Sequence, residues 1–140
     1  MTYVLDASVA LRWYIPGSTT LRAERILRLL LEHPSHFVLP ELFLYEVLAV
    51  LHRHHPQAQE IFEKQVDRIS RSGVLRYPLT PGIAARVPYF IEKGLTGYDA
   101  TYAAVAQEMK ALWLTFDSRA HRCIRAEKLS IDLNLQDIAG

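Results

Sequence analysis

The chain has 140 residues, half of them hydrophobic, enough to build the core of one domain without disulfides or structural zinc. Its formal net charge is only +1, which argues against a protein that coats nucleic acid nonspecifically. The single cysteine, Cys123, cannot form an internal disulfide, and no apolar stretch approaches the roughly 20 residues of a membrane span. We therefore expect one domain over residues 1–140, in the reducing cytoplasm, without a signal peptide or membrane contact.

Short apolar stretches alternate with longer segments of helical periodicity along the chain. Strands are predicted at residues 3–5, 37–39, 74–77 and 111–115, with a short edge strand at 130–133. Helices are predicted at residues 8–14, 21–32, 41–54, 57–72, 80–92, 97–109 and 118–127.

Several residues mark the ends of these helices. Pro16 and Gly17 should end the first helix, and the segment 18–20 (Ser-Thr-Thr) should cap the second. Pro88 should kink or split the helix at 80–92. Strands that alternate with helices predict an α/β fold of three layers, α/β/α. Its central sheet should contain about four to five mostly parallel strands and be covered on both faces.

Asp6 directly follows the first predicted strand and precedes a helix, a position that suits an N-cap as well as a metal ligand. Asp99, in the first turn of helix 97–109, and Asp117, after strand 111–115, are equally ambiguous. A carboxylate near a helix N-terminus is stabilised by the helix dipole whatever its function. None of the three residues decides the question alone.

Glu46 differs because it lies in the middle of helix 41–54. Its neighbours three and four residues away are Leu42, Phe43, Ala49 and Val50, so it points along an apolar face. A charged residue is seldom buried without a partner. The pattern indicates a ligand or a buried ion pair, or else a helix rim from which Glu46 reaches solvent.

Parallel pairing would bring Asp6 and Asp117 to one edge of the sheet, which the helices carrying Asp99 and Glu46 can also face. Two like charges 4 Å apart repel by roughly 4 kcal/mol at an effective dielectric constant of 20. Such a cluster must therefore raise its pKa values or bind a cation. Oxygen donors without Cys or His favour Mg²⁺ or Mn²⁺, and one or two such ions can activate water for phosphodiester hydrolysis.

Four segments of the chain, in order and spacing, resemble the PIN-domain ribonucleases, especially the VapC-type toxins of type II toxin–antitoxin pairs. These segments are Leu-Asp-Ala-Ser at 5–8, residues 40–51 around Glu46, Gly-Tyr-Asp-Ala-Thr-Tyr at 97–102, and Leu-Thr-Phe-Asp at 114–117. The resemblance covers nearly the whole chain and implies a PIN-like fold and Mg²⁺- or Mn²⁺-dependent RNA cleavage. It implies metal-binding and catalytic roles for Asp6, Glu46, Asp99 and Asp117, with Ser8 and Thr115 as polar neighbours. It also implies a homodimer and a cognate antitoxin.

Two positions depart from the family's pattern. Ala49 stands where an Asn is often found, and Ala120 and His121 stand where some members carry a further acid. The four-acid set is complete, but the residues leave open whether one metal ion or two would bind.

A basic strip of four residues follows Asp117 at every third position: Arg119, Arg122, Arg125 and Lys128. It could guide an RNA backbone toward the acids, or it could be an ordinary solvated helix face. Three histidines, His52, His54 and His55, have no acid or Cys at zinc spacing and better suit a helix C-terminus.

Four aromatic residues, Trp13, Tyr14, Tyr98 and Tyr102, could stack on bases, although aromatic residues at helical spacing more often belong to a core or an interface.

Two other classes of function share features with this sequence. A phosphoacceptor signalling domain also has a parallel sheet and an acidic Mg²⁺ pocket. That class needs a phosphorylatable Asp at the end of a central strand and a Lys directly after a later strand, whereas strand 74–77 ends without an Asp and no Lys directly follows strand 111–115. A non-catalytic PIN-fold interaction domain would be expected to have lost one or more of the four acids, and all four are present.

Overall fold

The computed structural model of the protein describes residues 1–15 and 20–138. In these residues, five parallel strands form one sheet in the order β3-β2-β1-β4-β5. The strands are β1 (Tyr3–Leu5), β2 (Phe37–Pro40), β3 (Leu75–Tyr77), β4 (Leu112–Thr115) and β5 (Ser130–Asp132). The α/β prediction is confirmed, and the sheet is parallel throughout rather than mostly so. The central strand β1 is buried along its whole length, as expected for a parallel sheet covered by helices.

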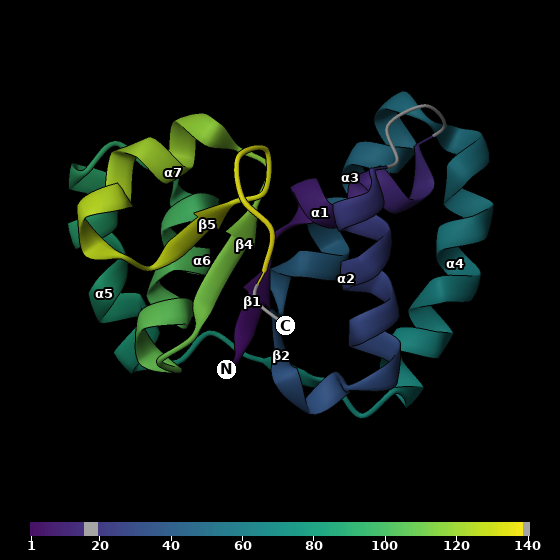
Figure 1. Ribbon diagram of the computed structural model, residues 1–140, viewed down its shortest axis with the longest axis horizontal. Coiled ribbons are helices and arrows are strands. Elements are labelled where there is room, and N and C mark those ends of the chain that lie inside the picture. Colours follow the sequence, from purple (N-terminus) through teal and green to yellow (C-terminus); the bar gives the residue numbers. More distant parts are fainter. Residues whose placement is uncertain (16–19, 139–140) are drawn as a thin grey trace.

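The helices form two groups around this sheet (Figure 1). On one side of β1 lie α1 (Ala7–Tyr14), α2 (Leu21–Glu32), α3 (Leu42–His54) and α4 (Pro56–Arg71). Around β4 and β5 lie α5 (Pro81–Glu92), α6 (Gly97–Glu108) and α7 (Ser118–Ile124). Short 3₁₀ turns cover Pro34–His36 and Arg125–Glu127. None of the helices in the described residues is long and apolar enough to cross a membrane.

Side-chain caps fix where several helices begin. The Thr20 hydroxyl accepts a hydrogen bond from the backbone N–H of Ala23, so the predicted cap of α2 is confirmed at Thr20. The rest of the predicted turn, residues 16–19 (Pro-Gly-Ser-Thr), lies outside the described residues. Pro56 and Pro81 occupy the first turn of α4 and α5, where the missing N–H of proline costs nothing.

The structure corrects two helix predictions in detail. Of the kink or split predicted at Pro88, the split is wrong: α5 continues through the proline to Glu92, and Ile83 and Phe90, on either side of it, are both buried and hold the two halves in place. The helix predicted at residues 118–127 ends at Ile124, whose side chain is buried. Beyond it the chain tightens into a 3₁₀ turn, and Lys128 takes a left-handed φ of 57° as the backbone turns toward β5.

Candidate metal centre

The four predicted acids come from four different elements that meet at one edge of the sheet. β1 and β4 pair with Leu5 opposite Leu114, so Asp6 follows β1 at the level of Thr115. Helix α6 packs on β1 and β4 and leads back to the start of β4, which puts its first turn, with Asp99, where the strands end. Helix α3 begins just after the end of β2 and carries Glu46 in its second turn. This edge is where open parallel sheets bind their ligands.

Asp6 is buried, with 3% of its surface exposed, and both of its carboxylate oxygens are hydrogen-bonded. Oδ1 accepts hydrogen bonds from the backbone N–H (2.9 Å) and the hydroxyl of Ser8. Oδ2 accepts them from the Thr115 hydroxyl (2.6 Å) and the Trp113 indole N–H (3.0 Å). A carboxylate has about four lone-pair sites, so the protein alone fills all of them. Asp6 therefore caps α1 and is held rigidly.

The buried position of Asp6 affects its ionisation. Loss of solvent raises the pKa of Asp6 to about 6, with a smaller contribution from the charge of Asp99. The hydrogen bonds from Ser8, Thr115 and Trp113 favour the ionised form and limit this rise in pKa.

Ser8 and Thr115 join Asp6 to the segment that carries Asp117. The Ser8 hydroxyl accepts a hydrogen bond from the N–H of Phe116 (3.0 Å), and the Thr115 hydroxyl accepts one from the N–H of Asp117 (3.0 Å). The two hydroxyl oxygens are 3.4 Å apart. The structure thus places both predicted polar neighbours in direct contact with Asp6.

Glu46 is held much less firmly. It is half-buried between the buried residues Phe43 and Val47, and its Oε2 is buried without a hydrogen-bond partner. Loss of solvent raises the pKa of Glu46 to about 7, and the charges of Asp6 and Asp99 add to this rise. No lysine or arginine in the described residues pairs with it. Of the interpretations left open by the sequence, a buried ion pair is therefore wrong.

Asp99 and Asp117 complete the chain of interacting charges. Burial, and then the negative charge of Asp117, raise the pKa of Asp99; a hydrogen bond with Thr96 and the charge of Arg119 oppose this. Asp117 Oδ1 accepts a hydrogen bond from the N–H of Ala120 (3.0 Å) and so caps α7. Repulsion therefore links Asp117 to Asp99, and Asp99 to Asp6 and Glu46.

The donor chemistry of this edge fits a hard divalent cation. Its acids offer only carboxylate oxygens, and the buried Glu46 Oε2 has no protein partner. Within residues 1–15 and 20–138, however, no three side chains of His, Cys, Asp or Glu lie close enough to enclose an ion as they stand. A bound cation would have to draw the carboxylates closer together.

Two buried aromatic residues lie next to the acids: Trp113, which the sequence analysis did not consider, and Tyr102, which it considered only for base stacking. Trp113, fully buried in β4, donates to Asp6, and its ring stacks on that of Tyr102 at a centroid distance of 6.1 Å and an angle of 13°. Burial, and then the charges of Glu46, Asp6 and Asp99, raise the pKa of Tyr102, which keeps its hydroxyl protonated. No sequence signal separates Trp113 from an ordinary core tryptophan.

The four aromatic residues that could stack on bases differ in how far they are exposed to solvent. Tyr14 and Tyr102 are buried and belong to the core. Trp13 is half-buried, and its indole N–H donates to the carbonyl of Ala23 (2.7 Å). Tyr98 is 67% exposed and is the one member of this set that could stack on a base without rearrangement.

A second unpredicted group supports the segment 115–118 from the other side. Asn134 donates its side-chain N–H to the carbonyl of Phe116 (2.7 Å) and to the Ser118 hydroxyl (3.0 Å). Asp132 holds Asn134 by accepting its backbone N–H (2.9 Å). Although burial opposes it, hydrogen bonding to Ser118 and Asn134 keeps the pKa of Asp132 below its usual value. The loop that follows β5 thus fixes the segment carrying Asp117.

All four residues of the basic strip are exposed, but they do not share one helix. Arg119 and Arg122 lie on α7, Arg125 begins the 3₁₀ turn, and Lys128 follows that turn. The exposed histidine His52 contacts Gln59 (2.9 Å), and no histidine in the described residues joins a metal-holding group.

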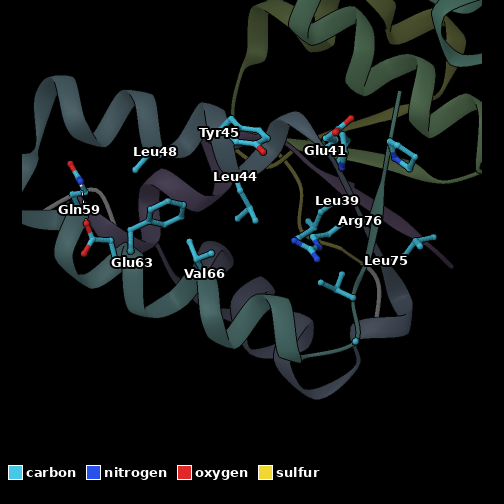
Figure 2. Close-up of a pocket in the computed structure, with 15 residues that line it drawn as sticks. Leu39, Glu41, Leu44, Tyr45, Leu48, Gln59, Glu63, Val66, Leu75 and Arg76 are labelled. Atoms are coloured by element: carbon cyan, nitrogen blue, oxygen red, sulfur yellow. Dashed lines mark hydrogen bonds between the residues drawn. The ribbon is translucent and has the colours of Figure 1, made fainter. Parts of the chain in front are cut away.

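A groove in the described surface lies away from the acids. It has a volume of about 1030 Å³ and lies between α3, α4 and the edge strand β3. Figure 2 shows Leu44 and Tyr45 of α3 on one wall and Glu63 and Val66 of α4 on the other. None of the four acids lines it, so α3 carries Glu46 at the acidic edge and Tyr45 at the groove.

The family model of the PIN domain matches residues 3–125, which is most of the chain. The chain belongs to the PIN domain family. This membership argues against the phosphoacceptor interpretation. No curated protein matches the sequence.

Several solved structures have the same fold. FitAcB from Neisseria gonorrhoeae has a TM-score of 0.70 at 15% identity, over 89% of this chain and 94% of that chain. A toxin–antitoxin complex from Klebsiella pneumoniae has a TM-score of 0.66 at 19% identity, over 98% and 100%. VapC20 from Mycobacterium tuberculosis, described as a sarcin–ricin loop cleaving toxin, has a TM-score of 0.66 at 17% identity, over 94% and 98%.

Proposed function

We propose that this PIN domain is a Mg²⁺- or Mn²⁺-dependent endoribonuclease, the toxin of a VapBC-type toxin–antitoxin pair. The metal would be held by Asp6, Glu46, Asp99 and Asp117. The observation that carries the proposal is the buried, unpartnered Oε2 of Glu46, close enough to Asp6 and Asp99 for their charges to raise its pKa. A protein that used this edge only for structure would lose stability by keeping such an oxygen.

The acids and the two hydroxyl groups have different proposed roles. A bound Mg²⁺ or Mn²⁺ would polarise the phosphodiester and lower the pKa of an attacking water. Asp6 provides the fixed reference point of the site, because four donors hold its carboxylate. The Ser8 and Thr115 hydroxyls can rotate, so one of them can free an Asp6 oxygen for the metal. Glu46 and Asp99, which are held less firmly, can move toward the same point.

The family and two structural neighbours support the proposed partners. RNA as substrate is supported by the neighbour that is described as cleaving the sarcin–ricin loop. A cognate antitoxin is supported by the toxin–antitoxin complex from Klebsiella pneumoniae. We further propose a homodimer that acts in the cytoplasm.

The test is incubation of the purified protein with structured RNA, such as total transfer RNA, in Mn²⁺ and in EDTA. We expect cleavage in Mn²⁺ only, and none by the Asp6→Asn variant when circular dichroism shows that it is folded. Cleavage that persists in EDTA, or equally in the folded variant, would refute the proposed function.

A further inference from the structure

Arg12 places a positive charge against the segment that carries Asp117. It lies on α1 one helical turn after Ser8, and therefore on the same face of that helix. Its guanidinium carbon is 4.0 Å from the centre of the Phe116 ring. Phe116 lies between Thr115, which donates to Asp6, and Asp117. The guanidinium therefore lies against the residue next to Asp117 in the sequence, and it forms no ion pair with any of the four acids.

Arg12 lacks the partners that an arginine of purely structural role normally has. Its Nε is buried without a hydrogen-bond partner, and no ion pair within the described residues includes it. Buried donors are nearly always hydrogen-bonded, and the donors of an arginine with a structural role usually pair with a carboxylate or a backbone carbonyl. Here the Phe116 ring lies against the guanidinium, and the terminal N–H groups of Arg12 pair with no carboxylate of the described residues, so they can donate to a ligand.

The ring under Arg12 is a fixed platform. The backbone N–H of Phe116 donates to the Ser8 hydroxyl (3.0 Å), and its carbonyl accepts from the Asn134 side chain (2.7 Å). The Phe116 ring is itself buried, with 8% of the residue exposed. Because the N–H and the carbonyl of Phe116 are both hydrogen-bonded, its ring is held in place and limits where the Arg12 guanidinium can lie.

We propose that Arg12 binds the RNA substrate by donating its guanidinium N–H groups to a backbone phosphate next to the one held at the acids. The planar fork of donors matches the oxygens of a phosphate, and a cation at this point offsets the repulsion between four carboxylates and a polyanion. This assignment rests on the proposed function, because it needs RNA at the acidic edge. It makes Arg12 an RNA-binding residue that the sequence pattern did not reveal.

The test compares two variants, Arg12→Gln and Arg12→Lys, with the control variant Arg28→Gln. Arg28 is an exposed arginine in the second half of α2, which leads toward the start of β2. The probe is a fluorescein-labelled RNA stem-loop, bound in Ca²⁺ at several KCl concentrations. We expect Arg12→Gln to weaken binding about tenfold, as loss of a charge-assisted hydrogen bond does. The slope of log K against log[KCl] should become shallower by about 0.7–0.9, the value for one lost phosphate contact. Arg12→Lys should keep the slope, and Arg28→Gln should bind as the wild type does.

A second measurement separates RNA binding from damage to the site. The rise in Tm caused by Mn²⁺ should be the same in Arg12→Gln and in the wild type. An unchanged affinity and slope in Arg12→Gln, or a loss of the Mn²⁺ effect together with RNA binding, would overturn the assignment while leaving wild-type cleavage intact. If the wild type neither binds nor cleaves RNA, the proposed function itself fails, and the assignment of Arg12 falls with it.

Discussion

Asp6 and Glu46 contribute to the same acidic edge but are supported in opposite ways. Asp6 ends a strand and receives four hydrogen bonds from Ser8, Thr115 and Trp113. Glu46 lies in mid-helix among apolar neighbours, and one of its oxygens is buried without any partner. On the strand side of the edge, the protein itself supplies all the hydrogen bonds that the Asp6 carboxylate can accept. On the helix side, Glu46 lacks a hydrogen-bond donor or a cation that would offset its negative charge.

This difference assigns two roles: Asp6 fixes the position of the site, and Glu46 carries a negative charge that a bound cation would offset. A carboxylate saturated by protein donors stays in place whether or not a metal is bound. A buried, ionised carboxylate without donors destabilises the metal-free protein, and either a bound cation or, at low pH, a proton removes this destabilisation. Variants on the two sides should therefore change activity in the same direction and metal-free stability in opposite directions.

The largest effect is expected on the helix side. Glu46→Gln and Asp99→Asn should each reduce Mn²⁺-dependent RNA cleavage by at least about 100-fold, more than the loss of an outer hydrogen-bond partner of a metal ligand costs. In EDTA both variants should be at least as stable as the wild type at pH 8, because a repelling charge is removed. Steady-state cleavage assays and thermal melts check this; a clear loss of metal-free stability would contradict the proposed contrast.

On the strand side, Thr115→Val should lower both activity and stability. It removes the donor to Asp6 Oδ2 and the acceptor for the N–H of Asp117. We expect the free energy of unfolding in urea to fall by about 1.5–3 kcal/mol, and activity by about 10- to 100-fold. Thr101→Val is the matched control, since that hydroxyl bonds only within its own helix, to the carbonyl of Gly97. Similar losses in both variants would refute a special role for Thr115.

The pKa shifts predict how stability depends on pH. In the folded protein the pKa values of Asp6 and Glu46 are raised from 3.8 and 4.5 to about 6 and 7, so the folded state keeps these protons to higher pH. Their contribution to stability is therefore present at low pH and lost as pH rises from about 4 to 7. Melts in EDTA should show a smaller loss over this range for Glu46→Gln than for the wild type. The rise in Tm with Mn²⁺ should grow from pH 5.5 to pH 8, and a rise that shrinks would contradict the assignment.

The smallest effect is expected in the basic strip. Arg119 lies on α7 close enough to Asp99 to lower its pKa, whereas Lys128 follows the 3₁₀ turn at the far end of the strip. Arg119→Gln should raise KM for RNA about threefold, as expected for one screened surface charge, and should leave kcat nearly unchanged. Lys128→Gln should change KM less. Equal effects would mean that the strip acts as a diffuse charge rather than through Arg119.

The fold was predictable because local signals agree along the whole chain. The strands, the cap at Thr20, the helix start at residues 80–81 and the acids after β1 and β4 all follow from spacing and residue type. Long-range packing decided the remainder. Burial on both sides of Pro88 kept α5 in one piece, and the turn toward β5 shortened α7.

The hydrogen bonds that hold the acidic edge in place could not be predicted, because they join residues far apart in the sequence. The Trp113 indole reaches Asp6 across 107 residues, and Asn134 holds Phe116 across 18. Neither residue stands in a pattern that differs from ordinary core or loop sequence. Glu46 was identifiable because an acid on an apolar helix face contradicts its surroundings, and such local contradictions often mark functional sites.

Metal binding by the four acids is tested most directly by titrating Mn²⁺ into the wild type, Glu46→Gln and Glu60→Gln at pH 8 while Tm is recorded. Glu60 is an exposed glutamate of α4 and provides the matched control. We predict that Mn²⁺ raises Tm in the wild type and in Glu60→Gln, and that the rise is largely lost in Glu46→Gln. No rise in the wild type, or the same rise in Glu46→Gln, would contradict the account.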